Sequence, residues 1–212
     1  MRRLLATVTV LVACLLGLPA TAQAAPAPIG GGSILFNLNH TARCTAAFAA
    51  RSASAGYLLA GPGCSSATQV YSGASVLVGP RTGTDWYSVV QVANTAAWTL
   101  VPWIDSGSGK VTIRGSRVTP VGGSVCLLSR TTGTRCGTVT ALNQTIQFPD
   151  GTITGVTRTN ICLEPDAIAF VSGDQAQGTP IGGSGSCSTG GVSYFQPVNP
   201  VLSAYGLTIL TG

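Results

Sequence analysis

The sequence predicts an all-β fold, and three features carry that prediction. Short runs rich in Val, Ile, Thr and Tyr alternate with Gly, Asn, Pro and Asp along the 212 residues, at a spacing typical of β-hairpins. Only 8% of the residues are charged, and abundant Gly, Ser and Thr suit a hydroxyl-rich β surface better than a disordered chain. Of the 7 cysteines, all but Cys14 lie beyond the first 24 residues, and their even number is typical of a disulfide-bonded exported domain.

The strand candidates leave little room for helix. The clearest are residues 57–60, 75–78, 87–92, 110–113, 137–141, 152–157 and 192–196. One helix is expected over residues 199–205, because Asn199 can cap it, Pro200 suits its first turn and Gly206 can end it. The Gly/Ser-rich residues 105–110 are either a boundary between two barrels or a hairpin tip. The length fits one sandwich or two small barrels.

The first 24 residues have the features of a secretory signal peptide. Arg2 and Arg3 precede an apolar run and an Ala-x-Ala end, so we expect cleavage after Ala24 and a secreted, extracellular protein. The apolar run is too short to span a membrane. Leu-Val-Ala-Cys14 resembles a lipoprotein cleavage box, but apolar residues follow that cysteine, which favours ordinary secretion. Cleavage lowers the formal charge from +5 to +3, too mild to indicate nucleic-acid binding.

Residues 161–187 resemble the active-site hairpin of chymotrypsin-like serine proteases of the streptogrisin and alpha-lytic type. In that family a cysteine and a Glu-Pro pair lead into Gly-Asp-Ser-Gly-Gly, whose serine is the nucleophile. Here the stretch begins at Cys162 as Cys-Leu-Glu-Pro-Asp and reaches Ala167, in a loop about two residues shorter. Residues 195–206 resemble the family's last strand and helix, and residues 29–32 its mature amino terminus.

The resemblance implies an architecture and a set of disulfides. It implies two six-stranded antiparallel β-barrels with a short C-terminal helix, the first over residues 25–110 and the second over residues 111–212. Six cysteines allow 15 pairings, and the sequence alone cannot choose among them. The family pattern implies Cys44 with Cys64, Cys126 with Cys136, and Cys162 with Cys187.

The catalytic positions of the family can be compared with this sequence one by one. A serine protease needs a nucleophilic hydroxyl, an imidazole, a carboxylate that orients it, and preset N–H donors. Gly63 stands before Cys64 where the family has histidine, and Ala167 stands where it has serine. Ile181 replaces a serine that helps to hold the carboxylate. Asp85 matches the carboxylate, although an ordinary turn aspartate is the alternative interpretation.

No other set of residues offers the missing chemistry. His40 is the only histidine and lies upstream of the first disulfide, where a surface or strand-edge role is expected. Ser172 sits in a Ser-Gly-Asp sequence, but no base is available to activate it. With the six cysteines assigned to disulfides, one histidine and scattered carboxylates give no metal-ligand spacing. Residues 30–32 are not followed by Lys or a helix start, so they form no phosphate loop. We expect no cofactor and no metal.

The sequence therefore predicts a protease scaffold without its chemistry: a pseudoprotease that is not an enzyme. Its expected role is to bind extended peptides or secreted protease inhibitors as a monomer, through Ile181, Gly182 and Gly183, a segment that can pair its backbone with an added strand. No nucleic acid or membrane partner is expected. Two alternatives remain open: a weak or unconventional serine endopeptidase or hydrolase of the trypsin-like family, and a structural exoprotein.

Overall fold

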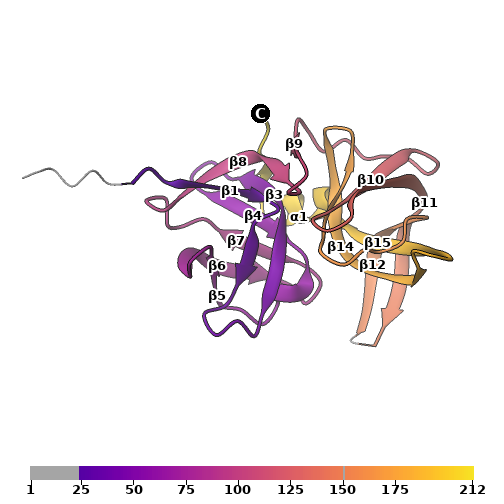
Figure 1. The fold of residues 1–212 in the computed structure, drawn as a ribbon, viewed down its shortest axis with the longest axis horizontal. Coiled ribbons are helices and arrows are strands. Elements are labelled where there is room, and N and C mark those ends of the chain that lie inside the picture. The colour runs from indigo at the N-terminus through magenta and orange to yellow at the C-terminus, as the bar shows by residue number, and fades with distance from the viewer. Residues whose placement is uncertain (1–23, 150) are drawn as a thin grey trace, which may run out of the picture.

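The structure of the protein is a computed structural model that describes residues 24–149 and 151–212. The predicted signal peptide and the lipoprotein box at Cys14 fall outside the described residues, apart from Ala24. Two β-structures lie side by side, with a short helix between them (Figure 1). Within the described residues, no helix has the length and apolar character needed to cross a bilayer.

The first β-structure contains one long sheet that returns on itself and one small sheet beside it. The long sheet has the order β16-β3-β2-β5-β6-β7-β4, and β3 also pairs with β4, which closes a ring. The small sheet has the order β1-β8-β9, in which β1 and β8 run parallel. The strands of these two sheets are β1 Ala27–Gly31, β2 Ile34–Phe36, β3 Arg43–Arg51, β4 Gly56–Ala60, β5 Gln69–Ser72, β6 Val76–Gly83, β7 Ser88–Gln91, β8 Trp98–Asp105, β9 Lys110–Thr112 and β16 Thr208–Ile209.

The second β-structure is a closed barrel of six strands, in the order β10-β11-β12-β15-β14-β13. They are β10 Ser124–Ser129, β11 Gly133–Phe148, β12 Gly151–Thr159, β13 Ala167–Ser172, β14 Gln175–Ser186 and β15 Gly190–Pro197. The prediction of two β-barrels with one short helix is confirmed. The boundary predicted between residues 110 and 111 falls inside β9.

One apolar core joins the two barrels and the helix. Phe48, Leu59 and Val89 of the first barrel belong to the same buried cluster as Leu128 and Ile168 of the second. The helix α1, Val198–Ala204, adds its three buried side chains to this cluster. Because a contiguous buried cluster marks a single core, the barrels are two halves of one packed unit.

The predicted helix is present, but it begins differently from expectation. It starts after Pro197, which supplies no side-chain cap, so the prediction that Asn199 caps it is wrong. Asn199 is already inside the first turn, and its Nδ2 instead donates to the carbonyl of Ser116 at 2.8 Å. Gly206 ends the helix as expected: its φ of 61° lets Leu207 N–H donate to Leu202 O at 2.8 Å.

The three disulfides are those that the family resemblance implied, and each closes a local loop. They join Cys44 to Cys64, Cys126 to Cys136, and Cys162 to Cys187, at sequence separations of 20, 10 and 25. By the chain-entropy argument each contributes about 2–4 kcal/mol.

Residues 105–110 form a hairpin tip between β8 and β9. Ser106 N–H donates to Gly109 O at 3.0 Å, and the flanking strands pair from Trp103 to Asp105. Of the two interpretations left open for this Gly/Ser-rich segment, the hairpin tip is therefore the one that holds.

Two tyrosines that meet at the margin of the core predict how stability depends on alkaline pH. The rings of Tyr87 and Tyr205 meet edge to face, with centroids 6.3 Å apart. Burial, reinforced by the charge and hydrogen bonding of Tyr205, raises the pKa of Tyr87 above 10.0. A raised folded-state pKa means that this contribution to stability is complete below the unfolded pKa and is lost as pH rises through the folded one.

We therefore expect Tyr87→Phe to lose less stability than the parent when pH is raised from about 9 to 11. Thermal unfolding followed by circular dichroism across that range measures the effect. Tyr71→Phe, a change in β5 outside this pair, is the matched control and should follow the parent. Identical alkaline slopes for the parent and Tyr87→Phe would contradict the assignment.

Candidate functional site

Asp85 lies in the turn between β6 and β7, with its side chain exposed. Its carboxylate makes no hydrogen bond or ion pair with another described residue. The turn is held by the guanidinium of Arg81, which donates to the carbonyls of Thr84 and of Tyr87, the latter at 3.2 Å. The same guanidinium donates to Ser65 O at 2.8 Å. Arg81 therefore ties the Asp85 turn to the segment that follows the first disulfide.

Gly63 lies in that neighbouring segment, in a single 3₁₀ turn, Pro62–Cys64. A Cβ built on Gly63 would stand 2.1 Å from the carbonyl oxygen of Arg43. This turn therefore accommodates no side chain at position 63 without moving its backbone neighbour. Arg81 thus connects the turn that contains Gly63 with the turn that contains Asp85. Gly63 itself has no side chain and therefore offers no functional group there.

Ala167 opens β13 in the second barrel, paired with Ser129 of β10. Its half-buried methyl group packs against the apolar cluster inside that barrel. The preceding loop is held in place because Ser129 Oγ donates to Pro165 O at 2.9 Å and Arg130 N–H donates to Asp166 O at 3.3 Å. Asp166 has a φ of 55°, a left-handed conformation that turns the chain into the strand.

An ion pair with one buried partner anchors the same loop to β11. The carboxylate of Glu164, almost fully buried, pairs with the half-exposed guanidinium of Arg135. Glu164 also lies within 4.8 Å of the sulfurs of Cys162 and Cys187. Both sulfurs are already used in a disulfide, so these three groups do not form a metal-ligand set.

Ile181, Gly182 and Gly183 lie in the part of β14 that has only one strand neighbour. β13 pairs with β14 as far as Gly178, whereas β15 pairs with it from Gly178 to Ser186. No other strand within the described residues pairs with the outer edge beyond Gly178, and residues 183–186 are exposed. The backbone N–H and C=O groups on this edge are available to pair with another chain. We call residues 181–186 the free edge.

One face of the free edge carries an aromatic cluster drawn from both barrels. The ring of Phe148 lies over Gly182, where a Cβ would stand 2.5 Å from a ring carbon. Phe148 is 5.3 Å from the ring of Trp86 and 6.4 Å from that of Tyr194, between centroids. Because Trp86 follows Asp85 in the chain, the cluster also places the Asp85 turn beside Gly182. We call Trp86, Phe148 and Tyr194 the aromatic cluster.

The opposite face of the same strand is covered by the loop after Cys162. A Cβ on Gly183 would stand 2.8 Å from Leu163 Cβ, and a Cβ on Gly191 would stand 3.0 Å from Cys162 Cβ. These segments are therefore in direct van der Waals contact. No ligand side chain fits between them in this conformation.

His40 and Ser172 lie outside this arrangement. His40 is exposed in the turn between β2 and β3, where its ring stacks on Phe36 with centroids 4.3 Å apart, as expected of a surface histidine. Ser172 ends β13, and its Oγ donates to Ser124 O at 2.8 Å. Its hydroxyl is thus engaged with the backbone of β10.

The comparisons with known proteins give a consistent family. No family model matches the chain. It is 34% identical over 176 residues to Serine protease 2 of Streptomyces fradiae, covering 78% of this chain and 100% of the relative. It is 51% identical over 126 residues to Streptogrisin-C of Streptomyces griseus, covering 58% and 28%. The structure of Thermobifida fusca Protease A matches with a TM-score of 0.74 and 36% identity, covering 88% and 100%. The alpha-lytic protease homolog N4 matches with 0.76 and 37%, covering 86% and 99%.

The chain belongs to the streptogrisin and alpha-lytic family of chymotrypsin-like serine proteases. It spans about a quarter to a half of the length of the streptogrisins it matches, 28% of Streptogrisin-C and 48% of Streptogrisin-A. The resemblance inferred from residues 161–187 is therefore confirmed at the level of the family and its fold.

Membership of this serine protease family overturns the prediction that the chain is not an enzyme. The chain matches Serine protease 2 of Streptomyces fradiae and Thermobifida fusca Protease A over essentially their whole length, and both are proteases by name. The prediction rested on Gly63 and Ala167, which concern a single arrangement of catalytic groups. Two positions of one arrangement do not decide whether a member of a protease family hydrolyses peptides.

Sequence reasoning missed the aromatic cluster and the contact of Leu163 with Gly183. The aromatic residues are separated by 46 or more positions in the chain, and only the packing of two barrels brings them together. One signal was present: Gly182 and Gly183 leave both faces of β14 open to close packing.

Proposed function

We propose that this chain is a secreted member of the serine protease family that binds extended peptides along the free edge of β14 and hydrolyses them weakly, through an unconventional set of groups. The observation that carries the proposal is the unpaired, exposed edge at residues 181–186. Three disulfides, which persist in oxidising surroundings, support the assignment to the exterior of the cell.

An extended peptide on the free edge would gain affinity from main-chain hydrogen bonds and selectivity from alternate side chains. Because Gly182 and Gly183 have no side chains, the backbone of a peptide can approach this part of β14 closely. Successive side chains of a strand point to opposite faces. One set would therefore meet the aromatic cluster, and the other would meet the side of Leu163, so apolar and aromatic residues are favoured in the bound peptide.

The hydrolytic part of the proposal rests on family membership, and its expected rate is low. Neither Gly63 nor Ala167 can supply a nucleophile or a base, so another hydroxyl or a water molecule must attack the peptide carbonyl. The exposed carboxylate of Asp85 precedes Trp86 of the aromatic cluster. We assign to it the role of base, accepting the proton of the attacking hydroxyl or water molecule. A carboxylate is a weaker base than imidazole. In subtilisin, loss of serine and histidine costs about a millionfold in turnover.

A hydrolysis assay on the chain from Ala25 onward tests this part. We expect slow release of peptides from casein, and lower release from Asp85→Asn at unchanged stability. Asp174→Asn, a change at another aspartate on the β13–β14 turn, is the matched control. A fluorophosphonate probe followed by peptide mapping identifies any activated serine. Homogeneous protein that neither cleaves casein nor reacts with the probe would refute the hydrolytic part.

The peptide-binding part is tested separately with Phe148→Ala. An aromatic contact contributes about 1 kcal/mol beyond buried area, so we expect about five times weaker binding of fluorescent casein peptides. Fluorescence anisotropy measures the affinity. Tyr71→Ala, an aromatic deletion in β5 of the first barrel, should bind as the parent does. Equal affinities for the parent and Phe148→Ala would argue against this placement of the peptide.

A further inference from the structure

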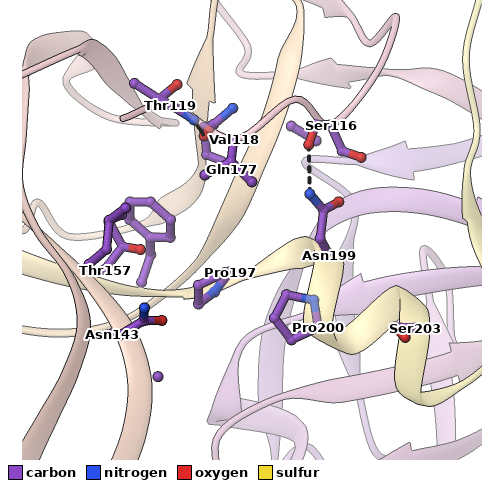
Figure 2. Close-up of a pocket in the computed structure, with 14 residues that line it drawn as sticks. Ser116, Val118, Thr119, Asn143, Thr157, Gln177, Pro197, Asn199, Pro200 and Ser203 are labelled. Carbon is purple, nitrogen blue, oxygen red and sulfur yellow. Dashed lines mark hydrogen bonds between the residues drawn. The ribbon is translucent and has the colours of Figure 1, made fainter. Parts of the chain in front are cut away.

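A second concave site lies at the opposite end of β14 from the free edge. It is a cavity of about 400 Å³ in the second barrel, between the segment that precedes β10, the strands β11, β12, β14 and β15, and the start of α1 (Figure 2). Its volume lies within the range of small-molecule sites. None of the groups considered for peptide binding or hydrolysis lines it.

The cavity exists because β11 and β12 bend away from the barrel at two irregular positions. Asn143 has a φ of 53° and Gly155 a φ of 77°, both left-handed. The pairing register of the two strands shifts between Ala141 and Gln144. Left-handed residues and register shifts of this kind mark β-bulges, which curve a strand locally. The curved pair leaves space beside Phe195 of β15.

Hydrogen bonds hold the roof of the cavity in place. Gln177 accepts from Thr119 N–H at 2.9 Å through Oε1 and donates to Arg117 O at 2.8 Å through Nε2. Asn199 Nδ2 donates to Ser116 O at 2.8 Å, the contact drawn as a dashed line in Figure 2. The segment of residues 116–119 is thus fixed to β14 on one side and to α1 on the other. The cavity is a preformed feature of the fold rather than a gap between loose loops.

The lining of the cavity is neutral and mainly apolar. Its walls include Leu142, Ala176, Phe195 and Pro197, with Val118 at the rim, and among the described residues no Lys, Arg, His, Asp or Glu lines it. A charged ligand would lose its hydration here without gaining a partner charge. The cavity therefore favours an uncharged molecule with a sizeable apolar body.

One threonine side chain contributes a hydroxyl group to this wall. It belongs to Thr157, which is only 3% exposed and lines the cavity, beside Asn143 and Pro197 in Figure 2. A hydrogen bond between a ligand and this hydroxyl would add to the affinity and would orient the ligand. The amide of Asn143 lies on the same wall and offers a second polar contact.

We propose that this cavity binds a small uncharged molecule with a flat apolar body of roughly ten to fifteen non-hydrogen atoms and one hydrogen-bonding group. The apolar body packs against Phe195, and the polar group bonds to the hydroxyl of Thr157. This site is independent of the free edge, and it stands or falls apart from the proposed peptide function.

Titration of the mature protein with three matched probes tests the proposal by NMR or calorimetry. We expect saturable binding of 2-naphthol, weaker binding of naphthalene, which has no hydrogen-bonding group, and at least about tenfold weaker binding of the 2-naphthoate anion than of 2-naphthol. Chemical shift changes should centre on Thr157, Phe195 and Ser203. The absence of saturable binding by both neutral probes, or equal affinity for 2-naphthol and 2-naphthoate, would overturn the proposal.

Variants of the wall separate this site from adventitious surface binding. Thr157→Val removes only the hydroxyl and should weaken 2-naphthol about five- to tenfold while leaving naphthalene unchanged. Thr145→Val makes the same change on an exposed part of β11 outside the cavity and should change neither. Ser203→Phe, at an exposed helix position on the rim, should weaken both probes by obstructing entry. Unchanged 2-naphthol affinity in Thr157→Val and Ser203→Phe would place the binding elsewhere and refute the site.

Discussion

The lack of side chains at Gly182 and Gly183 is the constraint on which the candidate peptide site depends. A Cβ at the first would collide with the ring of Phe148, and a Cβ at the second would collide with Leu163. Because both positions are glycine, an aromatic ring can lie on one face of β14 and an aliphatic side chain on the other. Among the described residues, the strand between them keeps an outer edge with no neighbour beyond Gly178. The geometry of the whole site follows from how closely two segments approach this strand.

The same contacts connect the two barrels. Phe148 belongs to the second barrel and Trp86 to the first, so the contact between their rings joins the two barrels. The shared buried cluster joins the same two barrels in the interior of the protein. Arg81 then links the turn of Asp85 to the turn of Gly63 through backbone carbonyls. Arg81 thus holds in neighbouring turns two of the positions, Gly63 and Asp85, that the family resemblance had singled out.

Local patterns in the sequence predicted local structure well. The predictions that failed, and the features that were missed, depended on contacts between distant residues or on the exact ends of an element. The strand runs, the helix that ends at Gly206 and the hairpin tip at residues 105–110 each depend on neighbours in the chain, and the disulfides followed from the family resemblance. Asn199 was assigned to a helix cap, but the helix begins earlier and its amide reaches Ser116, 83 positions away. The parallel pairing of β1 with β8 and the aromatic cluster likewise depend on contacts that no short pattern contains. The inference from two substituted positions to the absence of enzyme activity failed for a different reason, because it set two residues against the evidence of a whole family.

Hydrogen–deuterium exchange of the backbone amides of β14, with and without a tryptic digest of casein, shows whether a peptide pairs with the free edge. Residues 175–178 serve as an internal reference, because this part of β14 already pairs with β13, and Gly115 also bridges to Gln175 and accepts a hydrogen bond from Ala176 N–H. If peptides pair with the free edge, we expect slower exchange at residues 181–186 when they are present, and unchanged exchange at residues 175–178. Protection confined to other parts of the molecule, or no protection at saturating peptide, would contradict this pairing.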